Sequence, residues 1–154
     1  MLRLDKIKNS DHVVSVKISE ELIPGNVVKL GNLVDGEREI FEGATPGAIT
    51  EDVVLLTTPF FSYSEGDHKK DFKLKANSVN RAHVLEKGDV ITVSEDVISG
   101  SAVKNQYVIQ QASNAQLKAN ASQVETTTLE FKVIDIEESV PEFFGAKGIV
   151  LMVV

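Results

Sequence analysis

Short apolar runs rich in valine and isoleucine recur along the whole chain, separated by turn-forming pairs such as Pro24-Gly25 and Asp35-Gly36. The runs are about 4 to 8 residues long, which is the length of a strand and short for a helix. Residues 14–18 and 129–136 alternate in polarity, and residues 53–58 form a continuous apolar and β-branched run. Patterns with a helical period are scarce. The sequence therefore predicts an all-β fold, a small β-barrel or sandwich.

Turn signals predict how some of these strands are connected. Asp35-Gly36 predicts an antiparallel pair of strands, one at 27–30 and one at 39–42. Lys87-Gly88-Asp89 predicts a second strand–turn–strand unit within 84–94. Residues 60–80 predict a long mid-chain surface loop with a short helical turn around 71–76, and residues 110–122 predict a loop with a short strand near Leu117.

The two ends of the chain supply candidate contact residues. Residues 1–11 place Leu2, Leu4 and Ile7 among charged residues, with no evident partner in a single domain. They predict an extended N-terminal arm that docks on a neighbouring subunit, followed by a single β-rich domain at 12–154. The last run, 149–154, is unusually apolar, so it must be buried or paired across an interface. The candidate capsid or subunit contacts are Leu2, Leu4, Ile7, Phe60, Phe61, Tyr63, Ile149 and Leu151.

Composition excludes several classes of function. The 154 residues contain no cysteine, so neither a disulfide framework nor a thiolate metal site is possible. A net charge of −7 argues against a nucleic-acid partner, because phosphate binding needs clustered lysine and arginine. No apolar run approaches the ~20 residues of a membrane-spanning helix, and residues 1–11 lack the apolar core of a secretory signal. We therefore expect no membrane partner and synthesis in the cytoplasm.

Few residues offer catalytic chemistry. The three histidines, His12, His68 and His83, lie in no recognised motif, and His83 is expected to be a packed or surface neutral side chain. Asp67, His68 and Asp71 have the donors of a weak divalent-metal site, but a solvated polar loop explains their spacing better. We expect no enzyme, no metal and no cofactor. A β-barrel hydrolase or lyase that uses His68 or His83 is the alternative from the enzyme class.

Several segments, in order, resemble one known family. These are 27–43 with its Glu-Arg-Glu-Ile-Phe run, the apolar strand 52–59, an Asp71-Phe72 pair, and 80–94 with its Lys-Gly-Asp turn. Together they resemble the capsid decoration proteins, small head proteins of tailed bacteriophages. The resemblance covers roughly 14–107 and rests on patterned β-sequence rather than on catalytic residues.

The resemblance implies a structural virion protein on the capsid surface. Such a protein binds the outside of the phage capsid and stabilises the shell by bridging subunits of the major capsid protein. A homo-oligomer is expected, with a trimer favoured because decoration sites often lie on local threefold axes. The alternative from the binding class is a head-fibre module for a receptor or glycan, with exposed aromatic residues at 60–63.

Overall fold

The computed structural model describes residues 1–59 and 72–154, and their regular structure is almost entirely β-strand. The strands are β1 (Leu2–Lys6), β2 (Val13–Ile18), β3 (Val27–Leu33), β4 (Ile40–Ala44), β5 (Val53–Leu56), β6 (Val79–His83), β7 (Val90–Ser94), β8 (Ile98–Ser99), β9 (Tyr107–Gln111), β10 (Asn114–Asn120), β11 (Glu130–Val140) and β12 (Ala146–Val153). Two short 3-10 turns, η2 (Glu95–Val97) and η3 (Pro141–Phe143), are the only helical segments in the described residues. The predicted all-β fold is confirmed.

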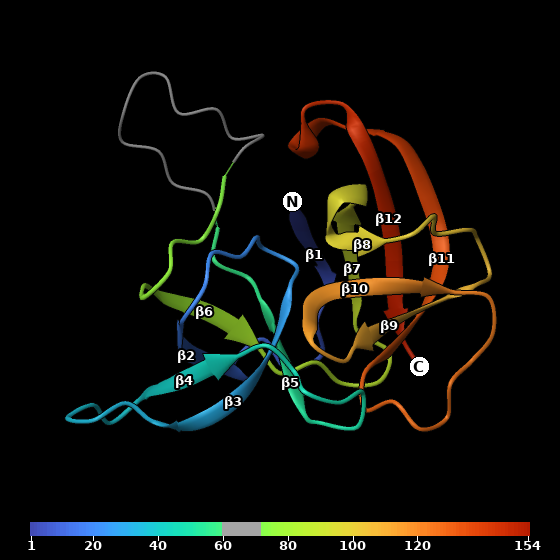
Figure 1. The fold of residues 1–154 in the computed structure, drawn as a ribbon. Helices are drawn as coiled ribbons and strands as arrows, with labels where there is room; N and C mark the ends of the chain where they lie inside the picture. The colour runs from blue at the N-terminus through green and yellow to red at the C-terminus, as the bar shows by residue number, and fades with distance from the viewer. Residues whose placement is uncertain (60–71) are drawn as a thin grey trace.

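The strands form two units that lie side by side (Figure 1). Strands β2, β4, β3, β5 and β6 close into a barrel in that order, and the other seven form a sheet with the order β1-β7-β12-β11-β9-β10-β8. Most neighbours are antiparallel, but β2 runs parallel to β4, and β10 runs parallel to β8. The chain begins in the sheet with β1, passes through the barrel, and returns to the sheet with β7.

The two units share a buried core. Val27 and Leu55 point from β3 and β5 into the core of the sheet, whereas their neighbours Val28, Val54 and Leu56 point into the barrel. Successive side chains on a strand face opposite sides, so a strand between two cores must be apolar at every position. This explains the continuous apolar run that begins at residue 53.

The C-terminal half of the sheet has a simple register. Phe131 and Val133 of β11 are fully buried and lie opposite Val153 and Leu151 of β12. On its other side β12 pairs with β7, so the apolar last strand is interior to the sheet of its own chain. The requirement that this strand be buried or paired is met without a second subunit.

The structure corrects the prediction for the N-terminal segment. Residues 1–11 were expected to have no partner within the domain, but β1 pairs antiparallel with β7, with Leu2 opposite Val93 and Leu4 opposite Ile91. The physical reason is that β7 would otherwise be a bare sheet edge, and Leu2 packs against the apolar core there. The arm is therefore an edge strand of the chain's own sheet.

Three further expectations about local structure were wrong in part. The turn at Lys87-Gly88 and the strand that follows it, β7, are as predicted, but β6 ends at His83 in the barrel and β7 belongs to the other sheet, so 84–94 is a crossover and not a hairpin. Within 72–76 there is no helical turn, because Leu74 is buried and pairs with Leu22 through two backbone hydrogen bonds. The short strand expected near Leu117 is present, but it is the seven-residue strand β10, which forms a hairpin with β9 in place of the expected loop.

Candidate functional site

A hollow of about 590 Å³ lies between β1 and the barrel, and we call it the β1 cleft. The sheet side contributes Met1, Leu2, Leu4, Asp96 and residues 142–144; the connection after β1 contributes Ile7 and Ser10; and the barrel side contributes Ile23, Pro24, residues 57–59, Phe72, Arg81 and His83. Most of these side chains are apolar, with a few polar groups among them. This composition is typical of a binding site for a ligand or a polypeptide segment.

The backbone of β1 adds hydrogen-bonding groups to the cleft wall. The amide of Ser94 donates to the carbonyl of Met1 at 2.9 Å, which makes Met1 and Ser94 a hydrogen-bonded pair. Hydrogen-bonded pairs alternate with non-bonded pairs along an antiparallel ladder. The backbone amide and carbonyl of Arg3 therefore also point toward β7, while those of Leu2 and Leu4 point away from it. No described strand lies on that side of β1. Leu2 and Leu4 therefore present four unpaired backbone groups at a sheet edge.

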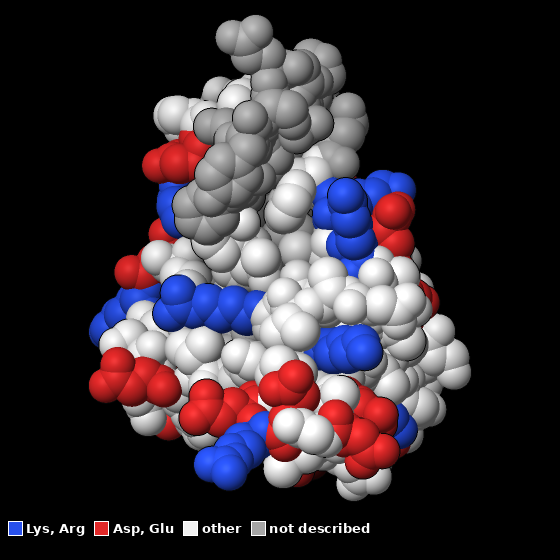
Figure 2. All heavy atoms as spheres, turned by 90° about the vertical axis from the view of Figure 1, so that its left-hand side faces the viewer, with Lys and Arg blue, Asp and Glu red and all other residues white. Residues whose placement is uncertain are grey.

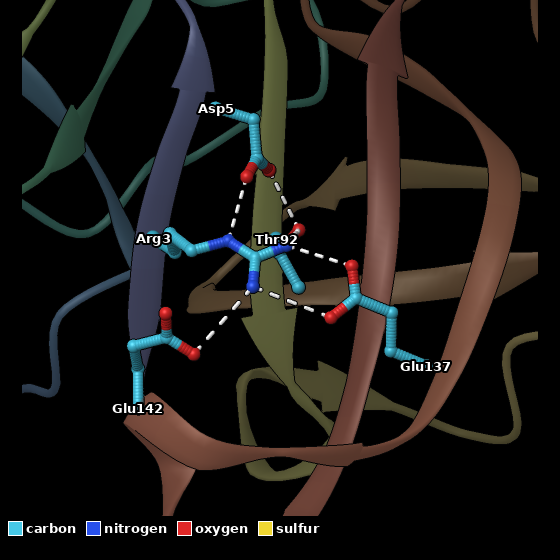
Figure 3. Close-up of polar contacts among 5 residues, drawn as sticks. All are labelled: Arg3, Asp5, Thr92, Glu137 and Glu142. Atoms are coloured by element: carbon cyan, nitrogen blue, oxygen red, sulfur yellow. Dashed lines mark hydrogen bonds and ion pairs between the residues drawn. The ribbon is translucent and has the colours of Figure 1, made fainter.

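Arg3 fastens β1 to the rest of the sheet, as Figure 3 shows. Its guanidinium donates to Glu137 of β11 at 2.7 and 3.3 Å, to Asp5 at 2.6 Å and to Thr92 of β7 at 3.1 Å. Thr92 in turn donates to Asp5 at 2.6 Å, and Glu142 lies 3.7 Å from the guanidinium. The hydrogen bond with Glu137, followed by that with Asp5, raises the pKa of Arg3 above its ordinary value. The network holds β1 in place from the face opposite Leu2 and Leu4.

The start of the chain is fixed as well. The Met1 ammonium lies 3.5 Å from a carboxylate oxygen of Asp96 and donates to the hydroxyl of Ser94. Burial lowers the pKa of this ammonium, and the charge of Asp96 opposes the effect. The carboxylates of Asp96 and Glu142 are themselves more than half exposed, at 58% and 59%. Each carboxylate therefore keeps a side open to solvent, although each also lies within 4 Å of a cation.

His83 lies on the barrel side of the cleft and is packed, as expected. Its side chain is 3% exposed, and its Nδ1 atom is 2.7 Å from the hydroxyl of Thr57. Burial lowers the pKa of His83, the charge of Arg81 lowers it further, and Asp89 opposes them. Among the described residues, the hydrogen bond joins His83 to a hydroxyl, and Asp89 acts on it through its charge.

Hydrogen bonds on the side of the sheet away from β1 also tie the barrel to the sheet. Gln110 of β9 is fully buried and donates from Nε2 to the carbonyl of Glu51 at 2.9 Å. The amide of Ser113 donates to the carbonyl of Pro46 at 2.7 Å, and that of Thr128 donates to the carbonyl of Ile49 at 3.0 Å. These bonds join the barrel loop before β5 to the far side of the sheet.

The candidate contact residues divide into three groups. Leu2, Leu4 and Ile7 come together in the β1 cleft. Ile149 and Leu151 are 2% and 0% exposed in the centre of the sheet, so they are core residues and cannot contact a partner. The third group lies outside the described residues and comprises Phe60, Phe61 and Tyr63. The three residues considered for a weak metal site also lie there, namely Asp67, His68 and Asp71.

Sequence reasoning missed most of the cleft. Ile23, Phe72, Arg81 and Phe143 were not singled out as binding residues, and they come from four separate segments of the chain. The one available signal was the Phe143-Phe144 pair after Pro141, since Phe144 is 55% exposed and adopts a left-handed conformation with φ of 56°. A bulky residue with positive φ is uncommon and marks a position that merits inspection.

A second hollow of about 300 Å³ is mostly polar. Its wall includes Glu20, Glu21, Lys73 and Asn26, and the buried Nδ2 atom of Asn26 has no hydrogen-bond partner. Lys73 forms an ion pair with Glu21 at 2.7 Å. No described lining residue is aromatic, so this hollow offers no ring on which a sugar could stack.

Two observations on the described residues bear on metal and nucleic-acid binding. No group of three or more histidine and carboxylate side chains in residues 1–59 and 72–154 could hold a metal ion. On the face seen in Figure 2, lysines and arginines are scattered among carboxylates and do not gather into a basic patch. In the described part of the chain, no helix is long and apolar enough to cross a membrane. No protein-family model, curated protein or solved structure matches the chain.

Proposed function

We propose that the chain is a structural virion protein of a tailed bacteriophage. In this proposal it binds the outside of the capsid, stabilises the shell by bridging subunits of the major capsid protein, and acts as a trimer. The observation that carries the proposal is the β1 cleft, an apolar site with open backbone groups on a rigid β-framework. The apolar wall and the open backbone groups support recognition of a polypeptide segment.

A rigid framework suits a bridging role. A protein that joins two subunits must keep its contacts at a fixed spacing, and the hydrogen bonds of Gln110, Ser113 and Thr128 tie the two units of this fold together. Each contact can be weak, since repetition over a symmetric shell raises the overall avidity without new kinds of contact. The sequence resemblance to decoration proteins supports the same reading.

Co-sedimentation with capsids tests the proposal. The protein is expected to pellet with expanded capsids of its own phage and to remain in solution with immature ones. Two matched variants locate the contact. Leu4→Glu places a charge in the cleft, and Val79→Glu places one on an apolar side chain of similar exposure outside it, at 50% against 38%. We expect only Leu4→Glu to lower occupancy, by about tenfold for a loss of 1.4 kcal/mol.

Two results would contradict the proposal. One is equal pelleting of the wild-type protein with and without expanded capsids. The other is binding that survives Leu4→Glu unchanged, which would place the contact away from the cleft. Analytical ultracentrifugation of the free protein tests the trimer.

A further inference from the structure

Strand β1 offers the one long open edge in the described structure. The barrel is closed, so its strands have no free edge, and the sheet ends in β1 on one side and β8 on the other. Strand β8 comprises only Ile98 and Ser99, which is too short to align a partner strand. Strand β1 has five residues, and its free side adjoins an apolar cleft. An added strand would therefore have to pair with β1.

The groups along this edge specify an extended polypeptide. The outward amides and carbonyls of Leu2 and Leu4 match the hydrogen-bonding period of a strand, and their side chains line the cleft at the same two-residue spacing. Addition of a strand to a sheet edge uses the backbone bonds for affinity and the pockets beside the edge for specificity. A compact small molecule would leave most of these backbone groups unpaired.

The charges at the cleft give the segment a polarity. Asp96 lies 3.5 Å from the Met1 ammonium and Glu142 lies 3.7 Å from the Arg3 guanidinium, but both carboxylates are more than half exposed, so each can accept a second cation. Arg81 lies on the barrel side, and no salt bridge joins it to another described residue. A bound segment with a lysine or arginine near the two carboxylates would complement them. An acidic residue toward Arg81 would add a second pair.

We infer that the β1 cleft receives an extended, mostly apolar segment of another protein, with a basic residue at the end near Asp96 and Glu142. The segment adds to the sheet as a neighbour of β1. That its owner is the major capsid protein rests on the proposed function; the strand addition rests on the edge and the cleft alone. Five residues of such a segment would span about 17 Å.

The first experiment uses a peptide probe and needs no capsid. The probe is a capped heptapeptide of alternating valine and threonine with lysine at one end and glutamate at the other, titrated into the whole protein. Amide hydrogen exchange at Leu2 and Leu4 reports on the edge directly. We expect saturating peptide to slow exchange of both amides by about tenfold, and N-methylation of alternate peptide bonds to abolish the effect. Replacing the peptide lysine by glutamate is expected to weaken binding about two- to fivefold.

Two variants at one position separate the backbone from the side chain. Leu4→Pro removes the outward amide of residue 4, which makes no bond to β7, so the edge strand is expected to tolerate it. Leu4→Ala removes the side chain and keeps the amide. We expect Leu4→Pro to bind the probe at least about fivefold more weakly than Leu4→Ala. Equal binding by the two variants, or unchanged exchange at Leu2 and Leu4, overturns strand addition. If Leu4→Pro fails to fold, the N-methylated peptide decides the question in the wild-type protein.

The same variants on expanded capsids separate this inference from the proposed function. Capsid binding that Leu4→Pro weakens beyond Leu4→Ala supports both. Capsid binding that is equal in the two variants leaves the virion role standing and refutes strand addition as its mechanism. Peptide binding without capsid binding upholds the strand addition and refutes the capsid as the owner. Self-association that is lost in Leu4→Pro would make a second copy of the chain the occupant, and would overturn the inference as stated.

Discussion

Closure of the barrel depends on a close approach that only glycine permits. Gly43 of β4 lies beside β2, where a Cβ atom at residue 43 would come within 2.3 Å of Cγ1 of Val16 and 3.5 Å of Cγ2 of Val28. Both valines are fully buried. Carbon atoms pack at about 3.5–4.0 Å, so the added methyl group would require a shift of more than 1 Å in a core that has little free space.

The expected cost of Gly43→Ala follows from this overlap. Overpacking a core by one methyl group costs about 1–3 kcal/mol, while the lower flexibility of alanine in the unfolded chain returns about 0.5–1 kcal/mol. We expect a net loss of about 1–2 kcal/mol, which for a chain of this size lowers the melting temperature by about 2–8 °C. Gly47→Ala is the matched control, because nothing lies within 3.6 Å of its Cβ position, and its effect should stay within about 0.5 kcal/mol.

A double-mutant cycle tests the cause. Val16→Ala alone leaves a cavity, but in combination with Gly43→Ala the new methyl group occupies part of that space. Thermal and urea denaturation should then show the double variant to be more stable than the sum of the single changes by at least about 1 kcal/mol. Additive effects, or a neutral Gly43→Ala, would refute the parallel β2–β4 contact that closes the barrel.

Three further predictions concern the sheet and the cleft wall. Val133→Asp should lower the free energy of unfolding by several kcal/mol, because it places an unpaired charge at a fully buried position; wild-type melting behaviour would contradict this. Burial lowers the pKa of His83 in the folded protein, so the unfolded chain binds more protons just below pH 6.5. Stability should therefore fall as the pH drops from about 6.5, and this fall should be smaller in His83→Gln but not in a His12→Gln control. Arg3→Met should cost about 1 kcal/mol and speed amide exchange in β1, with a smaller difference at high salt; equal exchange would show that the network does not anchor the strand.

The strands that were predicted correctly from the sequence are those in which burial of each face determines the pattern of apolar and polar residues. Val14 to Ile18 and Leu129 to Val133 alternate because one face of each strand meets a core. Residues 53–56 are apolar throughout because β5 separates two cores. In each case the information is local, since a single strand records its own two environments.

Strand β10 was predicted only as a short strand near Leu117, and its full length was not recognised because its turn and its outer face are polar. The residue that turns the chain between β9 and β10 is Ser113, with φ of 61°, and not the glycine that marks most such hairpins. Gln116 and Lys118 make the segment polar overall, so its composition resembles that of a loop. The spacing of Ala115, Leu117 and Ala119 was nevertheless the correct signal, since the first two are buried and the third packs against the core.

The order of the strands and the position of the cleft could not be predicted from one sequence, for a different reason. Arg3 forms a hydrogen bond with Glu137, which lies 134 positions later in the sequence. Leu2 pairs with Val93, and all the strands of the barrel lie between these two residues in the sequence. Periodicity identifies strands but not their partners, so the segment 1–11 looked free when it was an edge strand. The cleft exists only because this pairing brings residues 2–7, 57–59, 81–83 and 142–144 together.

The sequence of β1 fits an edge that must accept one partner and refuse others. Its outer face carries Arg3 and Asp5, and Lys6 follows, which are the kinds of charged residue that discourage indiscriminate pairing between sheet edges. Leu2 and Leu4 face the cleft instead, where the barrel forms the opposite wall. A second sheet edge would have to bring its own covering layer into that space. Selectivity for an extended segment over another folded edge thus follows from the barrel, which lies against the open side of β1 and limits what can reach it.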